Sequence, residues 1–224
     1  MALTDKLTAI ANAIRTKTGG TNSLTLDQMA SEISNIQSGG ANEPYIEEVY
    51  DSNGNLIDVN MHGFTKIRTN AFYGCSRLAL TSLPSGLTSI DSNAFYNCSS
   101  LALTSLPSGL TNIGLEAFYD CRSLALTCLP SGLTSIGSNA FYNCSSLALT
   151  SLPSGLTNIG YRAFSNCTGL TSITFEGTPT SISSKAFSNC TNLTTINVPW
   201  SEGAVADAPW GATKATINYN YTGE

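Results

Sequence analysis

The chain has 224 residues, a net charge of −5 and a sequence pI near 4.8. An acidic chain lacks the basic surface that binds nucleic acid, so we expect no nucleic-acid partner. No run of about 20 apolar residues occurs in the sequence, so we expect no membrane insertion.

Residues 1–37 are predicted to form a short helical hairpin. One amphipathic helix is expected over 3–18 and a second over 25–36, each with one apolar stripe. Helices this short are marginal alone, so the stripes must meet each other, a second subunit or another protein. A hairpin packed only on itself is the alternative to a docking or oligomerisation module. The predicted docking residues are Leu3, Leu7, Ile10, Ile14, Leu26, Met29, Ile33 and Ile36.

The next two segments connect this hairpin to the rest of the chain. Residues 38–44 include Ser-Gly-Gly and are predicted to be a flexible linker. Residues 45–63 are predicted to be an N-terminal cap or half repeat, in which 46–50 and 56–60 pair as a β-hairpin. Such a polar hairpin would cover the open end of the array that follows, as a terminal repeat must.

Residues 64–199 contain one 23-residue unit repeated without insertions. Its marker is an Ala-Phe-Tyr-x-Cys motif in four near-identical copies and Ala-Phe-Ser-Asn-Cys in two looser ones. A fixed period of this length is the signature of a solenoid, in which each repeat buries its apolar face against its neighbours. The cysteines that mark the six copies are Cys75, Cys98, Cys121, Cys144, Cys167 and Cys190.

Each unit predicts two extended pieces and one turn. Leucines lie three, five and eight residues after the cysteine and precede Pro-Ser-Gly, so we expect a strand there. A second extended piece ends in the isoleucine 15 residues after the cysteine. The Ala-Phe-Tyr segment is predicted to be one tight helical turn.

The spacing of Ala-Phe-x-x-Cys, the proline and the isoleucine resembles the BspA-type leucine-rich repeat family over about residues 64–199. This resemblance implies a strand-rich leucine-rich repeat solenoid, so with the N-terminal hairpin the expected fold class is α+β. The last two copies fit the family pattern best. The first four place leucine five residues after the cysteine where the family has an apolar residue at six, which leaves the alternation of their strands open.

The N-terminal block over residues 3–36 resembles segments that open tail-fibre and tail-tip proteins of phages infecting Gram-positive hosts. The resemblance implies that the N-terminal part attaches to a phage tail while the distal part meets the host surface. No signal-peptide pattern is found at the N-terminus, so we expect a virion tail protein assembled in the host cytoplasm. Its N-terminal helices would bind other tail proteins or further copies of the chain, and by analogy with other fibres the expected homo-oligomer is a trimer. Its repeats would bind a glycan or protein on the bacterial surface.

Two other functions remain open at this point. The chain is alternatively a bacterial BspA-like adhesin or scaffold that is no part of a virion. The near-identity of the first four copies also suits a spacer whose length is its function.

Comparison of the copies separates core from surface. Alanine, phenylalanine, cysteine, the leucines and isoleucine are constant in the first four copies, whereas the residue before each cysteine and the pairs that begin at Ser92, Leu115, Ser138 and Tyr161 change. These variable positions are expected to be exposed turns. Serine, threonine and asparagine dominate the remaining surface, which suits hydrogen bonding to sugars or protein backbone. The candidate ligand face comprises Thr81, Thr104, Thr127, Thr150, Tyr161, Trp200 and Trp210.

Residues 200–224 are predicted to be the C-terminal cap. Both tryptophans are expected to cover the last coil, and an alternating segment over 216–221 is expected to close its edge as a strand. An aromatic ligand platform built on Trp200 and Trp210 is the alternative.

No constellation typical of catalysis is found. The chain has one histidine, no paired metal-ligand spacing and no phosphate-binding loop, so we expect no enzyme activity, cofactor or metal. The six periodic cysteines are interpreted as a ladder of small buried thiols, one per coil.

Overall fold

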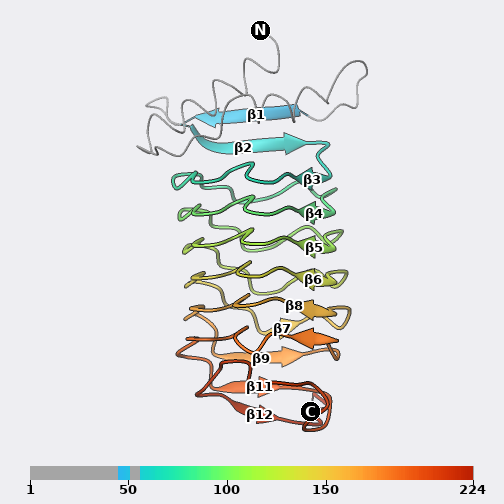
Figure 1. Cartoon of the computed structure of the whole chain (residues 1–224). Helices are drawn as coiled ribbons and strands as arrows, with labels where there is room; N and C mark the ends of the chain where they lie inside the picture. Colours follow the sequence, from blue (N-terminus) through green and yellow to red (C-terminus); the bar gives the residue numbers. More distant parts are fainter. Residues whose placement is uncertain (1–44, 51–55, 224) are drawn as a thin grey trace.

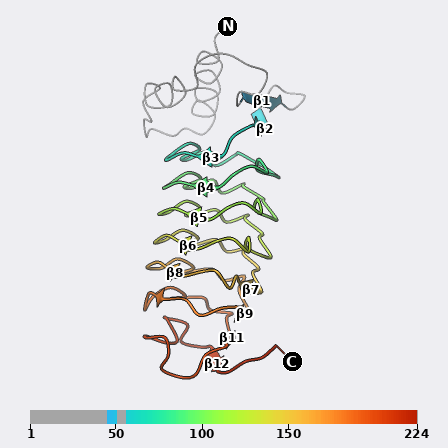
Figure 2. The same ribbon diagram turned by 90° about the vertical axis from the view of Figure 1, so that its right-hand side faces the viewer.

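The computed structural model describes residues 45–50 and 56–223. These residues form a β-solenoid of about seven turns with coils of about 23 residues (Figure 1). Figure 2 shows the coils stacked as successive layers from β3 toward the C-terminus. The predicted solenoid is therefore confirmed. The expected helices and the 38–44 linker lie outside the described residues, and the described part of the chain contains no helix.

The predicted hairpin precedes the stack. Strand β1 (Tyr45–Tyr50) pairs antiparallel with β2 (Leu56–His62), and Tyr45 lies opposite His62. Figure 1 shows these two strands at the N-terminal end of the stack, next to β3. The domain boundaries assigned from the sequence remain predictions.

A parallel sheet runs along the solenoid and is built from the isoleucine segment of each coil. Every strand contributes one buried isoleucine, which lies opposite the isoleucine of the next coil. Isoleucine suits a strand because its β-branched side chain packs well on a pleated surface. The six strands are β3 (Lys66–Ile67), β4 (Ser89–Ile90), β5 (Asn112–Ile113), β6 (Ser135–Ile136), β8 (Asn158–Ile159) and β10 (Ser181–Ile182).

A second parallel sheet occupies only the C-terminal part of the rod. It contains β7 (Ser151–Leu152), β9 (Ser172–Phe175), β11 (Thr195–Asn197) and β12 (Thr216–Asn218). The strand predicted before each Pro-Ser-Gly is therefore wrong for the first three copies. There, two exposed residues such as Thr104 and Ser105 separate the inward-facing Leu103 from Leu106, which breaks the period-2 alternation of a strand. The fourth copy has the same leucine spacing, and only Ser151 and Leu152, which pair with β9, form a strand there. In β9, Ile173 and Phe175 alternate regularly and are both buried.

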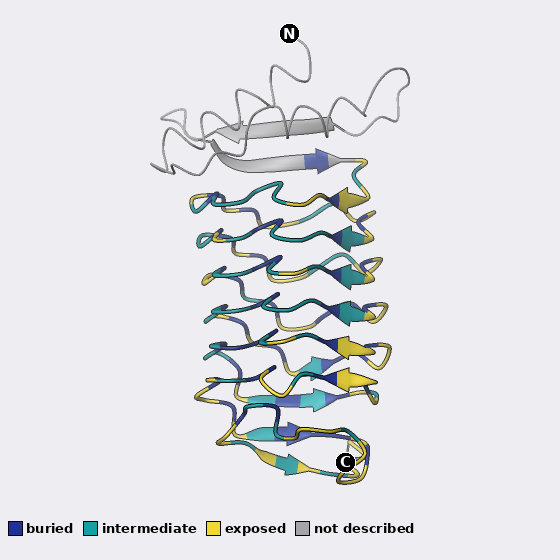
Figure 3. Ribbon diagram, viewed as in Figure 1, coloured by how far each residue is buried: buried dark blue, intermediate teal, exposed yellow. Residues whose placement is uncertain are grey.

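The Ala-Phe-Tyr-x-Cys segments are hydrogen-bonded turns and not the helical turn expected from the sequence. In each of the first five turns the phenylalanine N–H donates to the alanine carbonyl of the next turn, as Phe95 does to Ala117 at 2.8 Å. In the sixth, Phe187 donates to Trp210 of the C-terminal cap at 2.9 Å. Successive phenylalanine rings stack with centroids 5.1 to 5.4 Å apart. Figure 3 shows buried residues recurring at the same place in successive coils.

Each of the first five turns has a left-handed backbone at two positions, one and five residues before the cysteine, whereas the sixth has it only at Asn189. Asparagine is the commonest occupant, and Asn93 and Asn97 have φ angles of 56° and 57°. Asparagine tolerates this region better than other non-glycine residues. Its recurrence in the motif is therefore explained by backbone geometry. Glu116 and Arg162 are exceptions, at φ angles of 54° and 52°.

The periodic cysteines form the predicted buried ladder and also donate hydrogen bonds, which the sequence did not indicate. Cys98, Cys121, Cys144, Cys167 and Cys190 each direct Sγ at the phenylalanine carbonyl of the preceding turn at 3.0 Å. All seven cysteines of the chain fall within the described residues, and none forms a disulfide. Burial raises the pKa of these five thiols, in Cys190 to about 12.

The C-terminal cap continues the core of the solenoid. Trp210 is fully buried and Trp200 is 7% exposed. Their ring centroids lie 5.8 and 5.2 Å from that of Phe175, and the Trp210 Nε1–H donates to the Ala206 carbonyl at 2.7 Å. Strand β12 pairs in parallel with β11 and ends the second sheet, as expected for the closing strand.

Thiol labelling tests the buried ladder. We expect one thiol per folded chain to react with a chromogenic disulfide reagent, because only Cys128 is exposed, and all seven to react in denaturant. The variant Cys128→Ser, which introduces the residue found at this place in other copies, should show no fast reaction. Two or more fast-reacting thiols in the folded wild type would contradict the structure.

Alkaline pH should destabilise the rod. Unfolded thiols lose their protons near pH 9 while the five buried ones keep them, so the unfolded state binds fewer protons and stability falls as the pH rises above about 9. Each thiol contributes a loss of up to about 1.4 kcal/mol per pH unit, and the full stability is present below about pH 8. Urea unfolding at pH 7 to 11 measures this dependence. The variant Cys144→Ala should show a shallower slope, and an equal slope would count against the thiol origin.

Candidate binding surface

The four predicted threonines form a continuous exposed strip. Thr81, Thr104, Thr127 and Thr150 each lie six residues after a cysteine, and all four are exposed. They recur once per coil, at a spacing of about 4.8 Å for stacked strands. The nearby alanines and serines are mostly exposed as well, so this strip offers mainly methyl and hydroxyl groups. One carboxylate lies beside it, because the Ser151 hydroxyl next to Thr150 donates to Glu176 Oε1 at 2.7 Å.

The other predicted ligand residues lie elsewhere. Tyr161 is 43% exposed but belongs to the turn before Ala163, away in sequence from the threonine positions. Trp200 and Trp210 are buried against Phe175, so their rings are part of the core. A ligand platform needs exposed rings, and the alternative assignment of the tryptophans is therefore not supported by their placement.

A ladder of tyrosines is the surface feature that the sequence reasoning missed. Tyr73, Tyr96, Tyr119 and Tyr142 stack in register, with centroids 4.6 Å apart and ring planes within 9° of parallel. Each ring is partly exposed. Because neighbouring rings cover each other's faces, the accessible parts are ring edges and hydroxyl groups. We call these four residues the tyrosine ladder.

The hydroxyls of Tyr96 and Tyr119 are neutral at physiological pH. Burial raises the pKa of Tyr96 and of Tyr119, and the neighbouring tyrosines, Glu116 and Asp120 raise it further. Arg162 acts in the opposite direction on Tyr119. Each neutral hydroxyl is both a donor and an acceptor, so the ladder can exchange hydrogen bonds with hydroxyl or amide groups of a ligand.

In three of the four turns, the residue that follows the tyrosine adds a polar side chain beside the ladder. Asn97 and Asn143 hold this position in the second and fourth turns, Asp120 in the third, and Gly74 in the first. Asp120 accepts two hydrogen bonds from Arg122, at 3.0 and 3.1 Å, and a further one from Asn143. The third turn thereby gains a carboxylate–guanidinium pair.

A signal for the ladder was present in the sequence. Tyrosine recurs without change in the first four copies, two residues before the cysteine. The prediction of one helical turn for the Ala-Phe-Tyr segment does not specify which of its side chains face outward. In the second copy, for example, Phe95 is fully buried while Tyr96 is partly exposed.

These surfaces suit non-covalent binding. In the described ranges 45–50 and 56–223, no group of three or more His, Cys, Asp or Glu residues is placed to hold a metal ion. Across the same stretch of chain, no helix is long and apolar enough to span a bilayer. The exposed chemistry is that of hydroxyl, amide and aromatic groups arranged in rows.

The repeat geometry agrees with a known family. A model of the BspA type leucine rich repeat region matches six copies over residues 46–150 and 111–204, which together cover 46–204 of the 224 residues. The chain belongs to the BspA-type leucine-rich repeat family. Repeats of this type are typically found in non-enzymatic binding proteins. The match begins at residue 46, so it does not bear on the resemblance of residues 3–36 to phage tail proteins.

Two solved structures share the BspA-type solenoid. A leucine-rich repeat protein from Bacteroides ovatus is 30% identical with a TM-score of 0.55, and the match covers 63% of this chain and 39% of that one. The leucine-rich repeat protein of T. pallidum is 27% identical with a TM-score of 0.53, covering 72% of this chain and 85% of that one. This chain thus spans less than half of the Bacteroides protein. A search of the curated proteins found no match.

The BspA-type repeats are interrupted locally at Glu116. Its Oε1 accepts from Asn139 Nδ2 at 3.2 Å, but a carboxylate has no N–H to pass to the preceding coil. There, the buried Asn93 Oδ1 has no hydrogen-bond partner. The left-handed backbone adds a cost, since glutamate tolerates it less well than asparagine.

Replacing Glu116 by asparagine should therefore stabilise the rod. An asparagine at this position restores a row of side-chain amides from Asn93 to Asn139, so we expect the free energy of unfolding to rise by about 1–3 kcal/mol. Urea unfolding at pH 7 measures the change. The reverse variant Asn139→Glu should destabilise the rod, and a loss of stability in Glu116→Asn would contradict the argument.

Proposed function

We propose that this BspA-type protein is a non-enzymatic binding rod that attaches to a glycan or protein on a bacterial surface. The observation that carries the proposal is the tyrosine ladder, a partly exposed aromatic strip that continues over four coils. It is supported by the family's typical role in binding.

The ladder suits an extended ligand. Its rings repeat every 4.6 Å, so a polymer lying along the rod can meet several equivalent rings at once. Tyrosine contributes apolar contact area and a polar hydroxyl at a low entropic cost, because it has few rotatable bonds. Weak contacts of this kind add up through multivalency when one ligand spans several coils.

A virion tail protein is the second candidate. Its support is the resemblance of residues 3–36 to tail-fibre and tail-tip segments, and its residues Leu3, Leu7, Ile10 and Ile14 would belong to the contact with other tail proteins or with a second subunit. In that setting the protein would be a homo-oligomer, a trimer by fibre analogy, carried at the virion tail. Deleting residues 1–40 would then abolish incorporation into virions, whereas normal incorporation would exclude this role.

Binding of full-length labelled protein to Gram-positive cells and purified cell walls tests the main proposal. The variant Tyr96→Ser/Tyr119→Ser places in two coils the residue found at this position in Ser165 and Ser188, and it should weaken binding at least about tenfold. Circular dichroism and thermal unfolding verify that the variant remains folded. Protease treatment of the cells distinguishes a protein ligand from a glycan.

A matched control examines the other exposed strip. The variant Thr104→Ala/Thr127→Ala should bind as the wild type does, because these threonines lie outside the tyrosine ladder. Loss of binding in this variant alone would transfer the site to the threonine strip. Absence of wild-type binding to every cell and wall preparation would contradict the proposed function.

A further inference from the structure

Two large apolar side chains stand out from the described surface, and they occupy equivalent positions two coils apart. Leu115 is 45% exposed and Tyr161 is 43% exposed, and Ser138 holds the same place in the coil between them. Backbone hydrogen bonds keep these coils in register: Glu116 N–H donates to the Ser138 carbonyl at 2.9 Å, and Asn139 N–H to the Tyr161 carbonyl at 2.8 Å. Leu115 and Tyr161 are therefore separated by about 10 Å along the rod.

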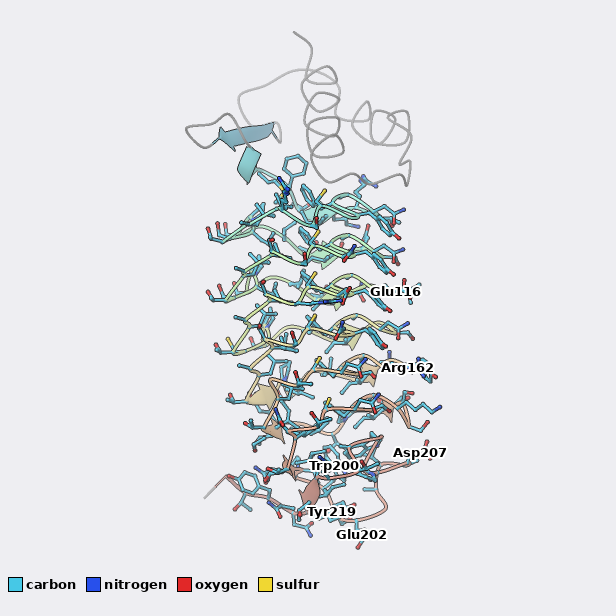
Figure 4. All side chains as sticks on the ribbon, turned by 90° about the vertical axis from the view of Figure 1, so that its left-hand side faces the viewer. Glu116, Arg162, Trp200, Glu202, Asp207 and Tyr219 are labelled. Carbon is cyan, nitrogen blue, oxygen red and sulfur yellow. The ribbon has the colours of Figure 1, made fainter. Side chains whose placement is uncertain are left out.

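The residues that follow them carry opposite charges. Glu116 follows Leu115, Arg162 follows Tyr161, and the neutral Asn139 lies midway. Figure 4 shows Glu116 and Arg162 along one edge of the stack. The Arg162 guanidinium lies 5.2 Å from the centroid of the Tyr161 ring, a cation–π arrangement that holds the cation beside the exposed ring. We call Leu115, Glu116, Ser138, Asn139, Tyr161 and Arg162 the edge row.

The charge pattern continues one coil further on the C-terminal side only. Lys185 holds the place of Arg162 one coil later, whereas the neutral Asn93 holds the place of Glu116 one coil earlier. The column that contains Glu116 and Arg162 is thus acidic on the N-terminal side of Ser138 and basic on its C-terminal side. A second copy turned end over end presents the opposite order, so the edge is complementary to itself.

The edge row retains its charges at a structural cost. Glu116 and Arg162 both adopt the left-handed backbone that asparagine adopts in neighbouring coils, and Glu116 leaves Asn93 Oδ1 without a partner. Asparagine, which holds this position in neighbouring coils as Asn93 and Asn139, would be less costly than either charged residue. Local cost of this kind is concentrated at sites with a function.

We propose that the edge row is a contact between two copies of this chain, packed antiparallel. The two-fold axis runs perpendicular to the rod at the level of Ser138. It brings Leu115 against the partner's Tyr161 and Glu116 against the partner's Arg162, and symmetry repeats both contacts. This inference is independent of the proposed ligand.

The physical character of the contact follows from its composition. Leucine and tyrosine supply the apolar area, and the paired charges fix the antiparallel orientation. The edge of a solenoid is narrow, so the buried area is small and the dimer is expected to dissociate at micromolar concentrations. Because the ion pairs lie at the surface, added salt should weaken the association.

Cysteine cross-linking in the full-length chain tests the position of the axis. In a Cys128→Ser background, Ser138→Cys places a thiol on the axis, where it meets its own copy in the partner. Oxidation should give a covalent dimer at least about tenfold faster than in the control Ser92→Cys. Ser92 lies two coils from the axis, so the thiol of this control does not meet its own copy in the partner. Equal rates for the two variants, or no covalent dimer from Ser138→Cys, would overturn the proposal.

Charge reversal tests the pairing itself, measured by sedimentation of the full-length chain. Glu116→Arg alone or Arg162→Glu alone should weaken association at least about tenfold, because each sets like charges against each other twice. Mixing the two single variants should restore it, since every pair is then again of opposite sign. Failure of the mixture to associate would overturn the proposal, and so would association of either single variant as strong as that of the wild type.

The design distinguishes this contact from other self-association. If residues 1–37 also oligomerise, their contribution is the same in every variant, and only the edge-row contact responds to mixing. The neutral variant Leu115→Ser/Tyr161→Ser introduces the residue found at Ser92 and Ser138, so it should remain folded. It should lose the concentration-dependent association, and association equal to that of the wild type would contradict the contact.

Discussion

The hydrogen bond from each phenylalanine N–H to the alanine carbonyl of the next turn is the constraint on which the rest of the rod depends. Each of the first coils contributes a single strand of only two residues, so the turns supply much of the backbone hydrogen bonding between coils. A turn that pairs with an identical turn tolerates no insertion, which explains the unbroken 23-residue period. Phenylalanine and cysteine are then stacked in register, and burial of these ladders stabilises each coil against its neighbours.

The same constraint separates structural from functional positions. Inward-facing residues must repeat because each one packs against the same residue type in the next coil. The outward-facing residues of a turn do not pack in this way, so they can vary. The tyrosine ladder keeps one residue type over four coils and so forms a continuous strip suited to a long ligand. The edge row does the opposite, because Leu115 and Glu116 differ from Tyr161 and Arg162 and therefore mark particular levels of the rod.

The sequence predicted what depends on the period and missed what depends on the local path of the backbone. The buried isoleucines, phenylalanines and cysteines were predictable because a fixed spacing can keep only a constant set of residues inside. The strands predicted before Pro-Ser-Gly are wrong in the first three copies. The leucine spacing breaks alternation in all four near-identical copies, and only the fourth, which lies beside β9, forms a short strand there. The outward direction of Tyr96 and the thiol hydrogen bonds depend on the turn geometry, which the predicted helical turn did not represent.

Native-state hydrogen exchange of the phenylalanine amides tests the central claim most directly. These amides lie in turns near the surface of the rod, and ordinary turn amides exchange quickly. If the bonds between turns hold the coils together, the amides of Phe95, Phe118 and Phe141 should exchange as slowly as those of the buried sheet at Ile113 and Ile136. Fast exchange at the phenylalanines with slow exchange at the isoleucines would show that the sheet alone holds the rod.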